Sequence, residues 1–290
     1  MDRRNFLSTA AAVAALSHSG SLAAASKRLP IKKAVGIGML PKDLSYEKRF
    51  QLAKDVGFEQ IECTTIRSED EARVIKEASE KAGLPIHSVM NSDHWKYPFS
   101  SSNPEDIKRG HECMEASLRN AHFWGGSTVL LVPAVVTPET RYEVAWERSQ
   151  KEIRKLLPLA EELKVVIAVE NVWNKFLVSP IEFAQYVDSF ENSWLKAYFD
   201  VGNVVLFGYP QDWIRTLGKR IAKLHLKGFR FRPVRGASRY VAAFVPLREG
   251  DIDWKAVYAA LRDIGYQGTA TTEVTGGGRD ELQLISHRVD

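Results

Sequence analysis

Short apolar runs alternate with longer amphipathic stretches along most of this chain. The short runs are rich in β-branched residues and are predicted to be strands at 34–40, 60–65, 86–91, 128–133, 165–171, 196–201, 222–227 and 269–274. Parallel strands that are joined by crossover helices produce this alternation. The pattern therefore predicts an α/β fold.

The clearest helical stretch covers residues 141–163. Val144, Ile153, Leu156 and Ala160 recur there at mixed three- and four-residue spacing, which places an apolar stripe on one face. Residue types at the ends of other stretches predict helix starts at Ser45, Ser68 and Ser179-Pro180, and left-handed helix ends at Gly57, Gly83 and Gly265.

Eight alternating units predict a single-domain (β/α)8 TIM barrel over residues 34–290. An open doubly wound sheet would more often carry a glycine-rich phosphate loop after its first strand. Gly36-Ile37-Gly38 lacks the third glycine of such a loop, so we interpret it as close packing inside the strand. Residues 228–253 form a long segment rich in Arg, Gly and Pro, which is expected to be a functional loop.

The N-terminal residues have the pattern of an export signal. Arg3-Arg4 precedes the alanine-rich run Ala10 to Leu16, and small residues follow up to Ala25. Residues 1–25 resemble a twin-arginine signal peptide, which predicts a periplasmic protein with an N-terminal segment at 26–33. The alternative is a buried alanine helix with a charged start. Because no later run approaches about 20 apolar residues, no membrane contact is expected after signal removal.

Composition narrows the functional classes. The chain has 290 residues and 44% hydrophobic composition, enough for one large core. The net charge is +4, but the basic residues are scattered, which disfavours a nucleic-acid footprint. Cys63 and Cys113 lack metal-pair spacing and are predicted to be buried thiols, with a single bridge as the alternative.

Four of the predicted strands carry an ionisable residue one or two positions before their end: Glu170, Asp200, His225 and Glu273. Active sites of such barrels lie where the strands end, so these side chains are expected to converge. Three carboxylates could not remain ionised in a buried cluster without a cation. One imidazole and three carboxylates suit one divalent ion, such as Mn²⁺, Mg²⁺, Co²⁺ or Zn²⁺. Taken singly, each residue could instead be a helix cap, a surface charge or a core histidine.

These strand ends resemble the xylose-isomerase-like barrel superfamily of sugar isomerases and epimerases, particularly ketose 3-epimerases. The resemblance runs from residue 34 to the C-terminus and rests on Val169-Glu170-Asn171, Phe199-Asp200-Val201-Gly202-Asn203, Lys223-Leu224-His225-Leu226-Lys227 and Thr272-Glu273-Val274. It implies that Glu170, Asp200, His225 and Glu273 bind one metal ion. It also implies that Glu170 and Glu273 are catalytic and transfer protons through an enediolate. Asn203 and Gly228 replace a histidine and an acidic residue of many relatives, so the substrate stays open.

Further polar and aromatic residues near strand ends suit a small sugar substrate, since aromatic faces stack on sugars and polar groups orient hydroxyls. The substrate-binding candidates are Glu62, His94, Trp95, Trp173, Asn174, Asn203 and Lys227. Loop packing explains the two tryptophans equally well. His87 is instead predicted to be a core histidine, and Arg230, Arg232 and Arg235 could bind an anion or belong to a solvated loop.

The leading functional hypothesis is a metal-dependent isomerase or epimerase of a non-phosphorylated sugar or keto-sugar, since phosphorylated sugars are largely cytoplasmic. The rival within the same site is a lyase acting on a 3-keto-glycoside or keto-inositol. From other classes, the alternatives are a non-catalytic sugar-binding protein and an apurinic endonuclease, which needs a more histidine-rich site than seven histidines allow. The sequence also leaves a homo-oligomer open.

Overall fold

The computed structural model describes residues 28–233 and 240–290. The predicted signal peptide at 1–25 and Arg235 therefore lie outside the described residues. Among the residues within these two ranges, no helix combines the length and apolar character that a membrane crossing requires.

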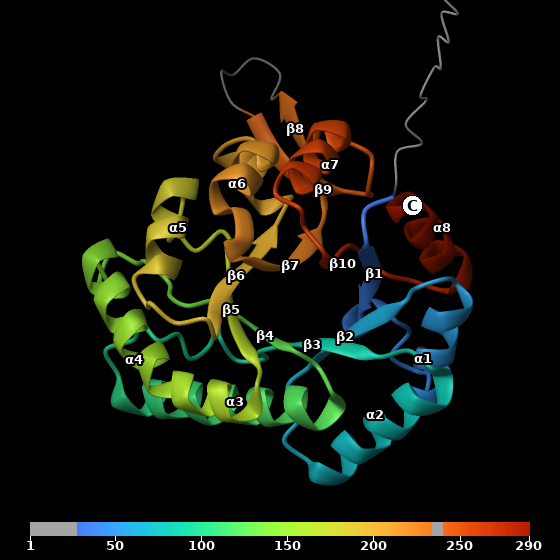
Figure 1. Cartoon of the computed structure of the whole chain (residues 1–290), viewed down its shortest axis with the longest axis horizontal. Helices are drawn as coiled ribbons and strands as arrows, with labels where there is room; N and C mark the ends of the chain where they lie inside the picture. The colour runs from blue at the N-terminus through green and yellow to red at the C-terminus, as the bar shows by residue number, and fades with distance from the viewer. Residues whose placement is uncertain (1–27, 234–239) are drawn as a thin grey trace, which may run out of the picture.

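Eight parallel strands of the described chain close into a barrel (Figure 1). They are β1 (Ile31–Gly36), β2 (Gln60–Thr64), β3 (Ile86–Met90), β4 (Thr128–Leu131), β5 (Val166–Glu170), β6 (Leu195–Asp200), β7 (Ile221–Leu226) and β10 (Gly268–Thr272). The order around the barrel is β1-β10-β7-β6-β5-β4-β3-β2, so the first strand closes the ring by pairing with the last. In the pairing of β1 with β10, Ile31 lies opposite Gly268 and Val35 lies opposite Thr272. The predicted (β/α)8 barrel is confirmed.

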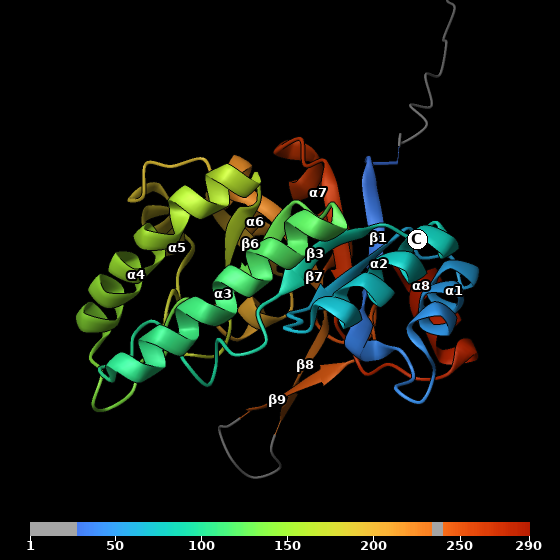
Figure 2. The same cartoon turned by 90° about the horizontal axis from the view of Figure 1, so that it is seen from below.

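Helices surround the barrel on its outer side (Figures 1 and 2). They are α1 (Tyr46–Asp55), α2 (Glu69–Ala82), α3 (Pro104–Trp124), α4 (Tyr142–Leu163), α5 (Pro180–Asp188), α6 (Pro210–Leu217), α7 (Trp254–Asp263) and α8 (Arg279–Val289), with short 3-10 turns η1 (Ile37–Met39), η2 (Asn203–Leu206) and η3 (Gly218–Arg220).

The predicted helix ends agree with the structure. The hydroxyls of Ser45, Ser68 and Ser179 each accept a hydrogen bond from a backbone N–H of the first helical turn. Gly57, Gly83 and Gly265 all have positive φ angles, of 96°, 58° and 66°.

The first strand differs from its prediction. It begins at Ile31, three residues before the expected start at Ala34, and it ends at Gly36. Because the chain then turns into η1, Gly38 has left the barrel wall, and a Cβ added there would meet nothing within 4 Å. The expectation of close packing at Gly38 was therefore wrong.

The segment predicted as a loop at 228–253 contains a β-hairpin. Its strands are β8 (Gly228–Pro233) and β9 (Tyr240–Val245), which pair antiparallel with Phe229 opposite Phe244. Figure 2 shows the hairpin projecting from the barrel at the end opposite to the start of β1. The alternation Gly-Phe-Arg-Phe-Arg from Gly228 has the period of a strand. This signal was overlooked because the Arg, Gly and Pro content suggested a loop.

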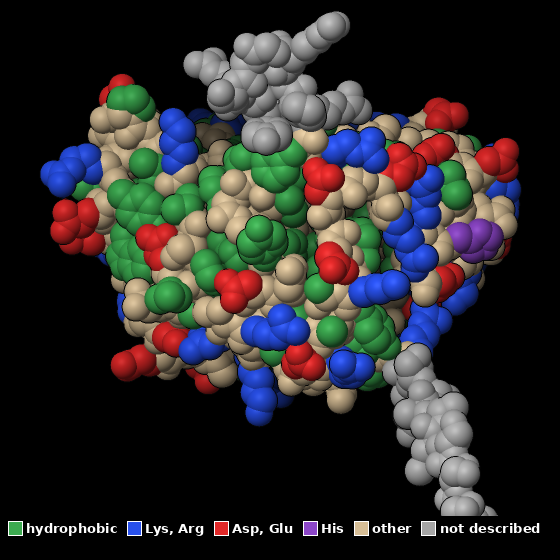
Figure 3. Space-filling view, turned by 90° about the horizontal axis from the view of Figure 1, so that it is seen from above, with side chains coloured by type: hydrophobic (Ala, Val, Ile, Leu, Met, Phe, Trp, Pro, Cys, Tyr) green, Lys and Arg blue, Asp and Glu red, His purple; other side chains and the backbone are tan. Residues whose placement is uncertain are grey.

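The predictions for the cysteines, for His87 and for the scattered surface charges can be compared with the structure. Cys63 and Cys113 are both free and buried, so the bridge is not formed. His87 is buried, as predicted for a core histidine. On the face shown in Figure 3, Lys and Arg side chains are interspersed with Asp and Glu, while hydrophobic side chains gather toward the α5 side.

Candidate metal centre

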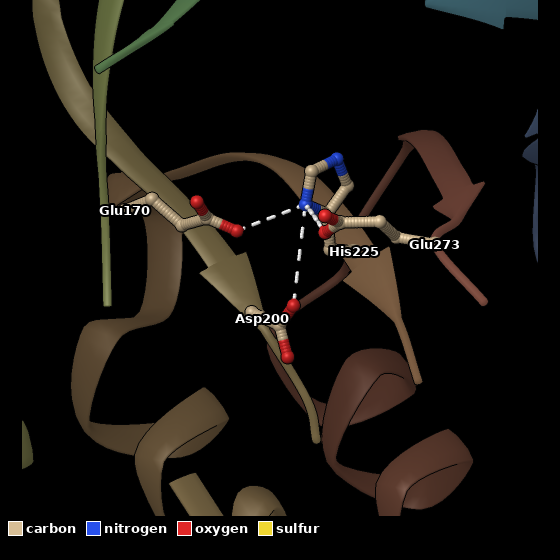
Figure 4. A group of neighbouring side chains, drawn as sticks. All are labelled: Glu170, Asp200, His225 and Glu273. Atoms are coloured by element: carbon tan, nitrogen blue, oxygen red, sulfur yellow. Dashed lines mark hydrogen bonds and ion pairs between the residues drawn. The ribbon is translucent and has the colours of Figure 1, made fainter. Parts of the chain in front are cut away.

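The four ionisable residues converge at one end of the barrel. Glu170 and Asp200 are the last residues of β5 and β6, His225 lies in β7, and Glu273 directly follows β10. These strands are consecutive around the ring, and one ligand atom from each residue lies within 4.8 Å of the others. Figure 4 shows the three carboxylates directed toward one nitrogen of His225. The structure therefore brings together the cluster that the strand ends predict.

The charges within this cluster are not balanced by protein groups alone. His225 Nδ1 lies 2.9 Å from Glu170 Oε1 and 2.8 Å from Glu273 Oε2, but a single ring nitrogen carries at most one proton. Asp200 Oδ2 and Glu273 Oε2 are buried without a well-aligned hydrogen bond among the described residues. Each lies 3.0 Å from Lys227 Nζ, so one ammonium faces both carboxylates. A divalent ion held by three carboxylates and one imidazole would satisfy these atoms, so the donor set fits the predicted metal.

Burial gives these groups unusual protonation behaviour. It raises the pKa of Glu170 to about 7, and it also raises the pKa of Asp200. Burial acts in the same direction on Glu273, but the neighbouring His225 and Lys227 outweigh it and lower the pKa of Glu273. For His225, burial opposes the charged form, yet the surrounding negative groups raise its pKa. The two glutamates therefore differ in their tendency to hold a proton.

Two asparagines hold the backbone beneath Asp200. Asn171 Oδ1 accepts a hydrogen bond from Asp200 N at 2.9 Å, and Asn171 Nδ2 donates to Asp200 O at 2.9 Å. Asn203 N donates to Asp200 Oδ1 at 2.8 Å, while Asn203 Nδ2 donates to Asn171 O. Asn203, a substrate candidate, thus also holds the Asp200 carboxylate in place. The prediction did not include Asn171, although its place directly after Glu170 was a usable signal.

A glycine allows Lys227 to reach the centre. A Cβ on Gly202 would lie 2.6 Å from Lys227 Cβ and 3.2 Å from Lys227 O, which is too close for any larger residue without a shift. The chain after β6 and the chain after β7 can therefore approach each other. This approach places the Lys227 ammonium beside Asp200 and Glu273.

Two substrate candidates make hydrogen bonds within the protein. Glu62 is 2% exposed and its carboxylate contacts His225 Nε2 and the Tyr198 hydroxyl. Asn174 Nδ2 donates to Ala134 O, and Asn174 Oδ1 accepts from the backbone N of Phe176. The polar groups of both side chains are therefore engaged by other parts of the chain.

An aromatic surface lies beside the centre. Trp173 is 41% exposed and stacks on Phe244 of the hairpin, with ring centroids 4.9 Å apart and planes 17° apart. Lys227 Nζ lies 5.3 Å from the centre of the Phe244 ring. Phe244 was missed because its segment was predicted to be a loop. The other tryptophan candidate, Trp95, is half exposed and meets His94 edge to face.

His94 makes a hydrogen bond that requires its neutral form. Its Nδ1 accepts from the backbone N of Val132 at 3.2 Å, and burial lowers the pKa of His94 to about 4. An unfolded histidine has a pKa near 6.5, so between pH 6.5 and 4 the unfolded chain binds more protons than the folded chain. The folded state therefore loses stability as the pH falls through this window, and the loss is complete below pH 4.

His94→Asn should reduce this acid sensitivity, because an amide oxygen can still accept from Val132 N and does not titrate. Between pH 6.5 and 4, the unfolding free energy of the variant should rise relative to the native protein by about 3 kcal/mol. Urea titrations at a series of pH values measure the difference. His287→Asn, at an exposed position, is the control. Parallel pH profiles for the native protein and His94→Asn would contradict the prediction.

Comparisons with known proteins agree with this architecture. Residues 50–288 match the family model described as a xylose isomerase-like TIM barrel. A putative L-ribulose-5-phosphate 3-epimerase, SgbU, from Escherichia coli K12 is 28% identical over 246 residues, covering 81% of this chain and 85% of the relative.

Two solved structures share the fold. 3-keto-D-glucoside 4-epimerase YcjR from E. coli has a TM-score of 0.72 at 14% identity, covering 89% of this chain and 97% of that one. A xylose isomerase-like TIM barrel protein from Mycobacterium smegmatis in complex with magnesium has a TM-score of 0.70 at 16% identity, covering 90% and 94%.

Proposed function

Since the chain belongs to the xylose isomerase-like TIM barrel family, we propose that it is a divalent-metal-dependent isomerase or epimerase of a non-phosphorylated sugar or keto-sugar. The observation that carries this proposal is the pair Glu170 and Glu273, which approach one nitrogen of His225 from the ends of β5 and β10. The epimerase names of SgbU and YcjR support the same reaction class.

The proposed ion would be held by Glu170, Asp200, His225 and Glu273. The magnesium complex of a protein with this fold supports a divalent ion, although the donor set suits several metals equally. A bound ion would supply Lewis acidity, making the C–H bond next to a coordinated ketone easier to deprotonate. Lys227 Nζ lies 3.0 Å from a carboxylate oxygen of both Asp200 and Glu273, and its charge favours the ionised form of both.

The two glutamates would exchange roles during one turnover. The ionised glutamate removes the proton from the carbon beside the ketone, while the other glutamate begins the reaction protonated. Returning a proton to the same carbon from the opposite side gives the epimer. Returning it to the former carbonyl carbon, with transfer of the hydroxyl proton to the former carbonyl oxygen, gives the isomer in which the carbonyl group has moved to the neighbouring carbon. At the end the first glutamate is protonated and the second is ionised, so solvent exchange must restore the pair.

The substrate class rests on two features. The twin-arginine-like sequence at 1–25 supports export to the periplasm, where free sugars and glycosides predominate, and cell fractionation tests this location. The exposed faces of Trp173 and Phe244 beside the centre could pack on the apolar face of a sugar.

The reaction can be followed by NMR in D₂O with Mn²⁺ present. We expect a free ketose or a 3-keto-glucoside to give its epimer or isomer, with deuterium incorporated at the carbon that is reprotonated. Ketopentose 5-phosphates serve as the comparison, and faster turnover of these would contradict the proposed substrate class. Aglycone release without any epimer would identify a lyase instead. Binding of the sugars without any deuterium exchange would identify a binding protein.

A further inference from the structure

The two nitrogens of His225 face different surroundings. Nδ1 faces the cluster, at 2.9 Å from Glu170 Oε1 and 4.0 Å from Asp200 Oδ2. Nε2 points away from it and lies 2.9 Å from Glu62 Oε1. Neutral imidazole has one N–H and one lone pair, so a proton on Nε2 leaves the lone pair of Nδ1 directed at the cluster.

Glu62 reaches His225 across the barrel interior. It lies in β2, which is not a neighbour of β7 in the ring, so backbone pairing does not impose this contact. Its Oε2 accepts from the Tyr198 hydroxyl at 2.7 Å and from the Ser88 hydroxyl. The Tyr198 hydroxyl also contacts Thr271 Oγ1 at 3.2 Å. Residues from several strands therefore fix the orientation of this one buried carboxylate.

We infer that Glu62 is a positioning residue that accepts the His225 Nε2 proton and thereby directs the Nδ1 lone pair to the divalent ion of the proposed function. Outer carboxylates of this kind fix the tautomer and ring orientation of a metal-binding histidine, and their loss weakens metal affinity about 10- to 100-fold. The inference rests on the proposed metal centre for its second half. Its first half, the hydrogen bond from His225 Nε2 to Glu62, concerns the metal-free protein as well.

Two variants separate the hydrogen bond from the charge. Glu62→Leu fills a similar volume but leaves the His225 N–H without an acceptor. Glu62→Gln keeps an oxygen that can face Nε2, while its NH₂ group can donate to the Ser88 and Tyr198 hydroxyls. Thr271→Val is the matched control, because it removes a partner of Tyr198 in the same buried network and leaves the Glu62 to His225 contact intact.

The first measurement is ¹⁵N NMR of histidine-labelled, metal-free protein over a series of rising pH values, with the His225 signals identified by their absence in His225→Asn. Because the surrounding negative groups raise the pKa of His225, the tautomer is read at the pH values where its ring has become neutral. We expect the Nε2–H tautomer in the native protein, in Glu62→Gln and in Thr271→Val, and a loss of this preference in Glu62→Leu. The second is calorimetric titration with Mn²⁺ alone. Affinity should fall about 10- to 100-fold in Glu62→Leu, fall less in Glu62→Gln, and stay unchanged in Thr271→Val.

The outcomes distinguish this inference from the proposed function. An unchanged tautomer in Glu62→Leu, or native Mn²⁺ affinity in that variant, would overturn the role of Glu62. An equal loss of affinity in Thr271→Val would also overturn it, because the effect would then come from packing. If the native protein binds no divalent ion, the proposed function fails, while the tautomer measurement still decides whether Glu62 positions His225.

Discussion

Glu273→Gln is expected to lower the turnover number about 10²- to 10⁴-fold at saturating Mn²⁺, which is the usual contribution of a general acid or base. The amide is nearly isosteric with the carboxylate and its oxygen can still bind a cation, but it cannot accept a proton from carbon. Glu170→Gln should have an effect of the same order, because in the proposed mechanism each glutamate acts on one face of the substrate. Steady-state kinetics on the sugar identified by NMR measures both effects.

Glu77→Gln is the matched control for these variants, since Glu77 is exposed on α2. Measuring Mn²⁺ affinity alongside turnover separates loss of the metal from loss of the base. Native turnover in either active-site variant, with the metal bound, would remove that glutamate from the mechanism.

Asp200→Asn is expected to abolish the stabilisation of the fold by metal. In the native protein, Mn²⁺ at a hundred times its dissociation constant should add about 2.7 kcal/mol to the unfolding free energy. Loss of a residue that binds the metal directly should weaken Mn²⁺ affinity by more than the loss of a residue that only hydrogen-bonds to a ligand, which costs roughly 10- to 100-fold. At the same Mn²⁺ concentration, the variant should therefore gain about 0.4 kcal/mol or less.

The metal-free variant should still fold. The asparagine oxygen can accept the hydrogen bond from Asn203 N, and burial already disfavours the charge on Asp200, as its raised pKa indicates. Asp212→Asn, at an exposed position of α6, is the control for the substitution. Thermal melts with and without Mn²⁺ test the prediction, and a native metal-dependent rise in the melting temperature of Asp200→Asn would exclude Asp200 as a ligand.

The sequence predicted those features that follow from local pattern. Glu170 and Asp200 each stand at the end of an apolar strand. A parallel barrel brings the carboxyl ends of all its strands to one face. Knowing the order of the strands was therefore enough to predict that these side chains converge. Helix ends such as Gly83 were predictable for the same reason, because they depend on the conformation of one residue.

Contacts across the barrel interior were not predictable in this way. Glu62 was predicted to contact substrate because it lies near a strand end. It lies instead at the middle of β2, and its partner His225 is 163 positions away. Which inward side chains meet depends on the stagger between strands, including the register shifts at Ile61/Glu62 and Ala197/Tyr198. A single sequence does not reveal this stagger. Tyr198 was therefore not predicted to contact Glu62, although it precedes Asp200 by two residues on the same strand.

The pairing of β1 with β10 also constrains when the protein can fold. β1 begins at Ile31 and its partner ends at Thr272, so the ring cannot close until nearly the whole chain has been synthesised. A chain that stops before Gly268 would leave β1 and β7 as open strand edges, which are prone to aggregation. The proposed export route, which accepts folded proteins, would suit this order of events, because the predicted signal at 1–25 is made first and the closing strand almost last.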